Sequence, residues 1–326
     1  MSSIFGFGKI SAAVPAAFSS PSEPRRIWAF GGGKGGIGKS FLCSNLAIAF
    51  ANLGYSVTIV DLDLGGANVH TCLGSPIPKK TISDFVQRHT PSLTDLIVPA
   101  PMKGVSFISG AEDDLTIANL KSEDRQRLLR GIQQLPGDFI FLDLGAGTTN
   151  LTLDAFLMAD KAITVLTPEP TSVENAYRFL KSSYYRKLRQ AEEAFGLKEL
   201  VDSIMNKSGP SAVRTPSDLL QQVLGQDSEK GTRLKEELSQ FKPHLIVNNI
   251  RSAADANLGA SMASVCRKYF GTPVEFIGAV EFDNAVWQAL RKRKPLLIDS
   301  PHSRTTHNIV ELARRLVGPR QTRLAG

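Results

Sequence analysis

The sequence predicts an α/β fold in which a doubly wound, mostly parallel sheet is flanked by helices. Short apolar runs alternate with helical stretches from residue 26 onward, an order typical of parallel strands joined by crossover helices. The runs are continuously apolar, as at residues 139–142, which is typical of strands that are buried on both faces. A glycine-rich turn at residues 31–38 joins the first run to the first helical stretch. These observations indicate one large domain.

Seven segments are predicted strands and five are predicted helices. The first strand, residues 26–30, leads into the glycine-rich turn, and the first helix, residues 40–54, ends at Gly54, which suits a C-cap. The other strands are predicted at residues 55–63, 104–110, 138–145, 161–169, 244–249 and 274–280, and the other helices at residues 121–135, 149–158, 172–190 and 309–317.

One segment breaks this alternation, because residues 181–243 contain no candidate strand. About 60 residues between two strands exceed a simple crossover. We interpret the segment as a helical insertion, either a partner-binding appendage or a packing elaboration. Residues 1–25, rich in Ser, Ala and Pro, and residues 318–326 are predicted tails, so the folded domain spans residues 26–317.

The overall composition is that of a globular protein of the cytoplasm. Hydrophobic residues make up 42% and charged residues 21% of the 326 residues, and no apolar run reaches the ~18 residues that a membrane-spanning helix needs. The first residues do not form a secretory signal, since Lys9 interrupts a short apolar stretch. The three cysteines (Cys43, Cys72 and Cys266) are widely separated in the sequence, and the five histidines lack ligand spacing. This pattern argues against disulfides and against a metal site built from cysteine or histidine. The net charge of +7 either favours polyanionic partners or serves solubility.

The glycine-rich turn carries the pattern Gly33-x-x-x-x-Gly38-Lys39-Ser40, which is typical of a phosphate-binding loop between a strand and a helix. Glycines let the backbone N–H groups turn inward around phosphates, and the helix that begins near Lys39 adds its positive end. Lys39 is therefore predicted to contact the β- and γ-phosphates of a nucleotide, and the Ser40 hydroxyl to bind Mg²⁺.

Acidic residues end the second and fourth predicted strands. Asp61 and Asp63 face the ligand crevice at the end of the second strand, where one can hold Mg²⁺ through water and the other can orient the attacking water. Asp143 follows four apolar residues, a Walker B pattern that brings a carboxylate close to the metal. Gly145 and Gly147 then let the backbone approach the γ-phosphate and move when it leaves.

Two alternatives stay open at this level. The pattern G-x-G-x-x-G at residues 31–36, followed by Asp61, is also a dinucleotide-binding fingerprint. The acidic pair of the second strand can be an ordinary feature of a strand end. The order of phosphate-binding loop, D-x-D and Walker B pattern favours a nucleoside triphosphatase over both.

A second lysine, Lys34, makes residues 34–40 fit the pattern K-G-G-x-G-K-[ST]. This deviant Walker A motif resembles that of the MinD/ParA family of P-loop ATPases, which implies that ATP and Mg²⁺ are the cofactors. The resemblance implies two catalytic residues: Lys34, which reaches the partner's nucleotide in an ATP-bound homodimer, and Asp63, which orients water. A capping role for Lys34 within its own chain is the alternative. The implied nucleotide-binding residues are Gly33, Lys34, Gly35, Gly36, Ile37, Gly38, Lys39, Ser40, Phe41, Gly147 and Asn248, and the implied metal-binding residues are Ser40, Asp61, Asp63 and Asp143.

Within the family, residues 61–69, 142–177 and 282–303 resemble the FlhG subfamily of MinD-like regulators of flagellar placement and number. The chain departs from this pattern at both ends. Residues 1–25 lack the Asp-Gln-Ala motif of that subfamily, and their apolar residues offer at most a weak membrane anchor. The apolar stripe of residues 309–317 is interpreted as a packed last helix rather than a membrane-targeting helix. The basic run at residues 291–294 suits a helix end, with phosphate binding as the alternative.

The resemblance implies a slow, partner-stimulated ATPase that acts as an ATP-dependent dimerisation switch in positioning or counting a cellular structure, such as a flagellum or a division site. It implies a homodimer and a further protein partner, for which residues 181–243 are the candidate surface. DNA and the inner membrane surface are the other candidate partners. The alternative functions are a ParA-type DNA-partitioning ATPase and a ligase similar to cobyrinate diamide or dethiobiotin synthetases. Iron–sulfur carriers need paired cysteines, which the sequence lacks.

Overall fold

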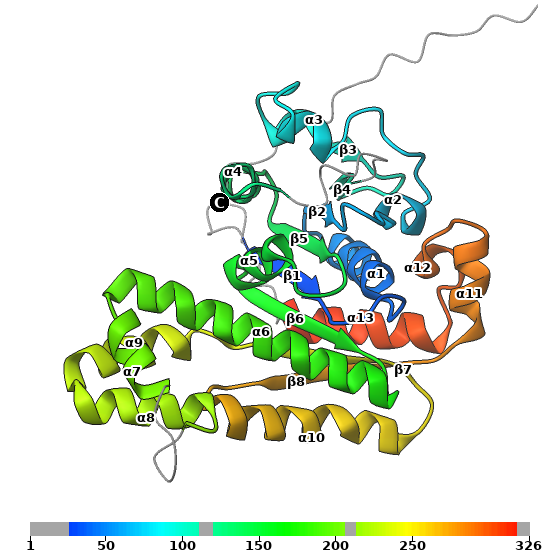
Figure 1. The fold of residues 1–326 in the computed structure, drawn as a ribbon. Helices are drawn as coiled ribbons and strands as arrows, with labels where there is room; N and C mark the ends of the chain where they lie inside the picture. The colour runs from blue at the N-terminus through cyan, green and yellow to red at the C-terminus, as the bar shows by residue number, and fades with distance from the viewer. Residues whose placement is uncertain (1–25, 111–119, 206–212, 318–326) are drawn as a thin grey trace, which may run out of the picture.

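A central sheet of eight strands organises the computed structural model, which describes residues 26–110, 120–205 and 213–317 (Figure 1). The strand order is β3-β4-β2-β5-β1-β6-β7-β8, and all neighbouring pairs are parallel except β3 and β4. The strands are β1 (Arg26–Gly31), β2 (Val57–Leu62), β3 (Val98–Pro99), β4 (Val105–Ile108), β5 (Phe139–Leu144), β6 (Lys161–Leu166), β7 (His244–Ile250) and β8 (Glu275–Glu281). The predicted fold class is confirmed.

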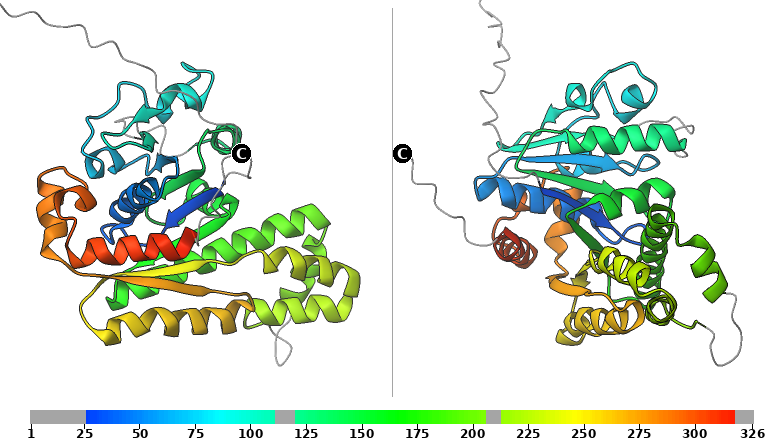
Figure 2. Two further views of the ribbon diagram at one scale, coloured as in Figure 1. Left: turned by 180° about the vertical axis from the view of Figure 1, so that it is seen from behind. Right: turned by 90° about the vertical axis from the view of Figure 1, so that its left-hand side faces the viewer.

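Helices cover both faces of the sheet, as the end-on view in Figure 2 shows. One face carries α1 (Lys39–Asn52), α2 (Val69–Cys72), α11 (Asn284–Arg291), α12 (Leu296–Asp299) and α13 (Arg304–Val317). The other face carries α3 (Ile82–Val86), the 3₁₀ helix η1 (Leu93–Leu96), α4 (Ser122–Gln133), α5 (Asn150–Met158), α6 (Pro170–Phe195), α7 (Lys198–Met205), α8 (Pro216–Gln226), α9 (Ser228–Ser239) and α10 (Ala253–Phe270).

The strands divide their side chains between two cores because successive residues of a strand point to opposite faces. In β1, Ile27 and Ala29 join the core under α4–α6, whereas Trp28 and Phe30 join the core under α1 and α13. Aromatic rings fill the second core, where Trp28 stacks on Phe141 with 5.5 Å between the ring centroids. The same alternation points the side chains of Asp61 in β2 and Asp143 in β5 toward the face that carries α1. The glycine-rich loop ends at the start of this helix.

Helices α6–α9 lie between β6 and β7 and extend the layer of helices that covers one face of the sheet. Helix α6 covers 26 residues without a break, so the predicted insertion boundary at residue 181 lies inside a helix. Its far end and helices α7–α9 extend beyond the sheet in Figure 1. The buried Tyr184 of α6 joins this outgrowth to the main body through Phe241 and Phe270, with ring centroids 5.7 Å and 5.1 Å away.

All predicted strands and helices are present, and the structure adds elements that were not predicted, among them helices α10 and α11. All seven predicted strands are present, and the structure adds β3, a two-residue strand that pairs antiparallel to β4 at the edge of the sheet. The predicted last helix is also confirmed, since Ile309, Leu312 and Ala313 of α13 are buried. Both predicted tails, including the candidate N-terminal anchor, lie outside the described residues. No helix in the described ranges is long and apolar enough to cross a membrane.

Candidate nucleotide-binding site

The glycine-rich loop lies at the carboxyl edge of the sheet, between the end of β1 and the start of α1 (Figure 1). Strand β1 is central, with β5 on one side and β6 on the other, so the chain connections diverge at this point. Ligands of open α/β sheets bind at such a switch point, outside the carboxyl ends of the strands. Helix α1 has no acidic residue in its first turn, so its positive end faces the loop without a neutralising side chain.

The loop needs glycine at specific positions. Gly36 and Gly38 have φ values of 76° and 91°, in the left-handed region that side chains disfavour. A Cβ on Gly33 would lie 2.1 Å from the carbonyl oxygen of Asn175 in α6. No heavy atom lies within 4 Å of a Cβ built on Gly35 or Gly36, so that side of the loop is open to an incoming phosphate.

Two apolar residues of the predicted nucleotide-binding set face away from the loop opening. The side chains of Ile37 and Phe41 are buried in the core under α1. Any contact that they make with a phosphate must therefore come from their backbone N–H groups. Gly147, also predicted, lies across the loop, where its N–H donates to the Gly32 carbonyl at 3.3 Å and its φ is 91°.

Lys39 lies inside the loop, only 6% exposed. Its ammonium donates to the Lys34 carbonyl at 3.4 Å. Burial lowers the pKa of Lys39, and the charges of Asp143 and Asp63 act in the opposite direction. A desolvated cation beside inward-turning N–H groups suits the phosphate contact that the sequence predicts.

Asp143 is the clearest unsatisfied group of the site. It ends β5 opposite Asp61 of β2 and is fully buried. Neither of its carboxylate oxygens has a hydrogen-bond partner of ordinary geometry among the described residues. Burial raises its pKa to about 7, although the nearby Ser40 hydroxyl and Lys39 ammonium partly oppose the rise.

The group around Asp143 fits Mg²⁺. A carboxylate without a partner, the Ser40 hydroxyl and the charge of Asp63 provide the hard oxygen donors that this ion prefers. Ser40 and Asp143 would hold the ion, with Asp63 close to it.

The structure gives Asp61 a different environment from Asp143. Its carboxylate accepts hydrogen bonds from the backbone N–H of Asp63 at 3.1 Å and of Val69 at 3.0 Å. Burial and the neighbouring Asp143 nonetheless raise its pKa well above the usual range. These bonds make Asp61 a support of the loop between β2 and α2, and direct metal binding by Asp61 stays a prediction.

Asp63 lies on that loop and faces the loop that follows β5. A Cβ on Gly145 would lie 3.1 Å from the Asp63 carboxylate. The loop after β2 and the loop with Gly145 and Gly147, which is predicted to move with the γ-phosphate, therefore meet at this carboxylate.

Lys34 points away from the interior of the loop. Its ammonium donates to the Thr171 hydroxyl at 3.2 Å and lies 3.8 Å from the Glu169 carboxylate. The Lys34 side chain is 42% exposed, and a surface pair of this kind contributes little free energy. The contact corresponds to the alternative of a capping role within the chain, but it is weak enough to be exchanged.

The structure shows which of the two asparagines at the end of β7 contacts the glycine-rich loop, a choice that the sequence left open. Asn248 is buried and donates from Nδ2 to the Ile37 carbonyl at 2.9 Å, so it supports the glycine-rich loop. Asn249 has a φ of 59°, which turns the chain after the strand. The predicted contact of Asn248 with adenine is compatible with this position and stays a prediction.

A cleft beside this strand end was not found from the sequence. It has a volume of about 490 Å³ and is lined by residues from the ends of β7 and β8 and the starts of α10 and α13: Ile250, Arg251, Ser252, Ala253, Glu281, Phe282 and Arg304. The Arg251 guanidinium lies 3.8 Å from the centre of the Phe282 ring. This ring and cation offer a planar group a stacking surface. No sequence motif brings residue 251 next to residue 282.

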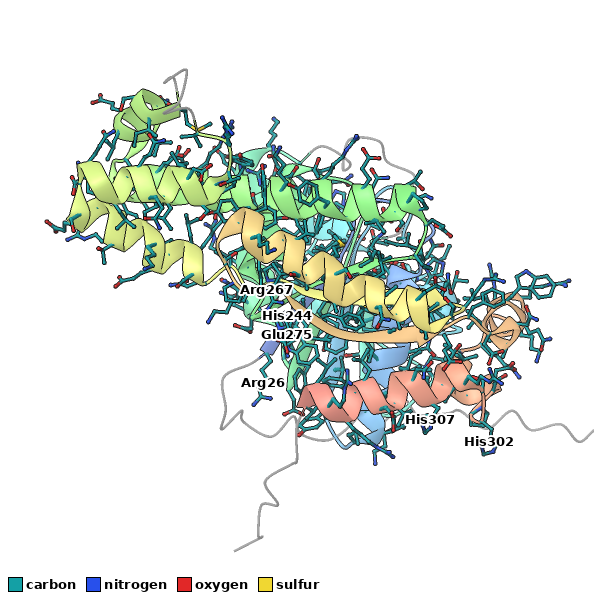
Figure 3. All side chains as sticks on the ribbon, turned by 90° about the horizontal axis from the view of Figure 1, so that it is seen from below. Arg26, His244, Arg267, Glu275, His302 and His307 are labelled. Atoms are coloured by element: carbon teal, nitrogen blue, oxygen red, sulfur yellow. The ribbon has the colours of Figure 1, made fainter. Side chains whose placement is uncertain are left out.

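The histidines and cysteines form no second site. Figure 3 shows His302 and His307 at the start of α13, far from His244, which lies beside Glu275. Within the described ranges, no three His, Cys, Asp or Glu residues could hold a metal ion together. All three cysteines are free and buried.

Comparisons with known proteins agree with this geometry. The ParA family model, described as "NUBPL iron-transfer P-loop NTPase", matches residues 24–189. The antiactivator FleN of Pseudomonas aeruginosa is 23% identical over 287 residues, which cover 87% of this chain and 83% of FleN. The flagellum site-determining protein YlxH of Helicobacter pylori is 29% identical over 177 residues, 51% of this chain and 56% of YlxH. The septum site-determining protein MinD of Pyrococcus horikoshii, solved with Mg-ADP, superposes with a TM-score of 0.58 at 20% identity and covers 90% of this chain and 96% of that chain.

Proposed function

The chain belongs to the MinD/ParA family of P-loop NTPases, and we propose that it is a Mg²⁺-dependent ATPase that works as an ATP-dependent dimerisation switch. The observation that carries the proposal is the pair of lysines in one loop. Lys39 is buried inside the loop, whereas Lys34 lies on its outer side in a weak contact. One lysine therefore suits the nucleotide of its own chain, and the other is free to serve a second chain.

The residues of the site divide the work of phosphoryl transfer, which consists mainly of positioning and charge stabilisation. The open side of the loop, at Gly35 and Gly36, would receive the phosphates, and Lys39 would neutralise their charge. Ser40 and Asp143 would hold Mg²⁺, which when bound neutralises charge on the β- and γ-phosphates. Asp63 would orient the attacking water, because its carboxylate extends from the loop after β2 toward the loop after β5.

The proposed role of Lys34 requires its present contacts to be replaced. Leaving Thr171 and Glu169 costs little, because the pair is exposed. Reaching an anionic phosphate of a partner's ATP gives a charge-assisted hydrogen bond, which is about twice as strong as a neutral one. This difference would couple dimer formation to the presence of the γ-phosphate.

The proposed biological role is spatial or numerical regulation of the flagellum, in the cytoplasm. Two relatives support it by their names, the antiactivator FleN and the flagellum site-determining protein YlxH. The iron transfer in the family description suits this chain less well, because its three cysteines are buried and therefore poorly placed to hold an exchangeable cluster. Helices α6–α9 offer the candidate surface for a regulating protein partner.

The test is the molar mass of the purified chain by size-exclusion chromatography with light scattering, in ADP and in Mg-ATP. We expect a monomer in ADP and a stable dimer in Mg-ATP for Asp63→Ala, which retains the phosphate-binding loop but lacks the residue that orients water. Lys34→Ala should still bind nucleotide but remain monomeric in Mg-ATP. Lys235→Ala, an exposed lysine of α9, is the matched control and should behave as the wild type. A mass independent of nucleotide in the wild type and in Asp63→Ala would refute the switch.

A further inference from the structure

A cleft lies between helices α4, α5 and α6, which follow one another from top to bottom in Figure 1. Its volume is about 700 Å³, a size typical of small-molecule sites in proteins. It is lined by the later residues of α5 and the second half of α6, whereas the first residues of both helices adjoin the nucleotide-binding site. We call this second site the α4–α6 cleft.

Arginines dominate the charge of the α4–α6 cleft. The lining arginines are Arg125, Arg130, Arg186 and Arg189, and the acidic residues are Asp154 and Glu193. Four cations against two anions leave two positive charges without an opposite charge among the lining side chains. A ligand that fits this cleft must therefore be anionic.

The floor of the cleft is already complete. Arg125, only 9% exposed, donates from Nε to the Asp154 carboxylate at 2.7 Å and from Nη2 to the Ser122 hydroxyl at 3.3 Å. Arg186 donates to the same carboxylate from Nε at 2.8 Å and from Nη2 at 3.0 Å. This clamp holds the three helices together without a ligand, so the shape of the cleft is preformed.

The rim of the cleft carries the unbalanced charge. Arg130 of α4 and Arg189 of α6 are both exposed, and neither forms an ion pair with another residue in the part of the chain that the structure describes. Glu192 acts on Arg189 only from beyond ion-pair distance. The two rim arginines belong to different helices that border one cleft, so a single anion between those helices can interact with both.

The other side chains of the cleft suit the body of an organic molecule. They are three glutamines, which offer both donors and acceptors, and three partly buried apolar residues: Gln126, Gln133, Gln190, Leu129, Leu157 and Met158. The planar fork of an arginine binds phosphate through two parallel hydrogen bonds. The cleft therefore combines phosphate-binding groups on its rim with an amphipathic interior.

We propose that the α4–α6 cleft binds a small organic phosphate, a phosphate monoester with a partly apolar body. A phosphate monoester carries close to two negative charges at neutral pH and three acceptor oxygens. It balances the two rim arginines, whereas a carboxylate balances only one. The concave shape and the buried Arg125 favour a small molecule over a nucleic acid, whose backbone needs an open positively charged track.

The test is isothermal titration calorimetry of the full-length chain with phenyl phosphate, which joins one phosphate to an apolar body. Mg-ADP is present so that the glycine-rich loop is occupied. Phenyl phosphate should bind more tightly, by about fivefold or more, than inorganic phosphate, which lacks the body, and than benzoate, which carries one negative charge. Lys39→Ala without nucleotide should bind phenyl phosphate with the same affinity, because the proposal does not depend on the function proposed for the glycine-rich loop.

Charge variants locate the site. Arg130→Ala combined with Arg189→Ala should weaken phenyl phosphate binding by about tenfold or more, because both charge-assisted contacts are lost. Arg233→Ala combined with Lys235→Ala removes two exposed cations of α9 and is the matched control, which should bind as the wild type does. All four substituted residues are exposed, so the variants should keep the fold.

A second pair of variants separates the cleft from its charge. Gln126→Trp fills the cleft and keeps all four arginines, and it should also weaken binding. Gln134→Trp changes an exposed glutamine at the end of α4, outside the lining, and should have no effect.

Four outcomes would overturn the proposal. They are the absence of a binding signal at millimolar phenyl phosphate, undiminished binding in either cleft variant, an equal loss in the matched α9 control, and benzoate binding as tight as that of phenyl phosphate. The third outcome would mean that net charge attracts the phosphate, and the fourth would mean that the cleft does not select phosphate.

Discussion

Two carboxylates, one fully buried and one partly buried, organise two regions of this molecule in opposite ways. At the carboxyl edge of the sheet, Asp143 has no hydrogen-bond partner of ordinary geometry among the described residues. Between α4, α5 and α6, Asp154 accepts hydrogen bonds from the Arg125 Nε at 2.7 Å and from the Arg186 Nε and Nη2 at 2.8 Å and 3.0 Å. One region keeps a charge-bearing group unsatisfied, and the other surrounds it with cations.

The difference indicates which region awaits a ligand. Buried polar atoms in folded proteins almost always have partners, so an orphaned carboxylate implies a group that is absent from the chain itself. The Asp154 region needs nothing further, because its arginines neutralise it and fasten α5 to α4 and α6. Substitutions at the edge should therefore change ligand binding more than stability, and substitutions between the helices should do the reverse.

The largest expected effect is on nucleotide affinity. Lys39→Ala should weaken ATP binding by about 100-fold or more, equivalent to about 2.7 kcal/mol, because it removes a charge-assisted contact in a desolvated loop. The melting temperature should change little, since the substitution also removes a buried cation. Isothermal titration calorimetry measures the affinity, with Lys235→Ala as the control. Wild-type affinity in Lys39→Ala would place the nucleotide elsewhere.

The next effect is on stability. Asp154→Ala leaves the arginines Arg125 and Arg186 without their carboxylate, and we expect the free energy of unfolding to fall by about 2–3 kcal/mol, less than for a fully buried pair because Arg186 is partly exposed. The melting temperature should fall by roughly 5–10 °C. ATP affinity should remain within about twofold of the wild type, since Asp154 lies outside the site.

The control for this substitution is a surface pair. Glu229→Ala removes the partner of Arg233 in an exposed i,i+4 pair of α9, and it should cost about 0.5 kcal/mol or less. An equally small loss in Asp154→Ala, or a large loss of ATP affinity, would contradict the division between the two regions.

The sequence predicted the residues at the carboxyl edge of the sheet better than the contacts between α4, α5 and α6, for a physical reason. A phosphate-binding loop depends on backbone conformations that only glycine adopts easily. Its residues are therefore consecutive and can be recognised in the sequence. Because successive side chains of a strand point to opposite faces of the sheet, the position of Asp143 in its strand then determines the face on which its carboxylate lies. The clamp around Asp154 depends instead on residues 125 and 186, which only the tertiary packing of three helices brings together.

Three details of the sheet and its carboxyl edge were not predicted from the sequence. Asp61 and Asp63 were equivalent as members of one motif, but backbone N–H groups occupy the Asp61 oxygens once the loop to α2 is formed. The Arg251–Phe282 cleft joins the ends of two strands from distant parts of the chain. The short strand β3 was missed because two residues carry too little pattern to indicate pairing.

The smallest predicted effect concerns pH and tests the orphaned carboxylate directly. Burial raises the pKa of Asp143 to about 7, above the ~3.9 of an unfolded aspartate. The folded chain therefore holds a proton that the unfolded chain releases, and this contribution to stability is lost as the pH rises through 7. Between pH 6 and 8, it should lower the free energy of unfolding by roughly 1 kcal/mol.

Asp143→Asn lacks the titrating group, so its melting temperature relative to the wild type should rise by about 2–4 °C between pH 6 and 8. Melting is measured by calorimetry in EDTA without nucleotide, with Glu229→Gln as a control that should follow the wild-type profile. Burial raises the pKa of Asp61 with the same sign in all three proteins. The part of that rise that comes from Asp143 is absent in Asp143→Asn, and its absence changes the difference in the same direction. A parallel pH profile for Asp143→Asn and the wild type would mean that Asp143 is already ionised, and the carboxylate would then need a cation even before nucleotide arrives.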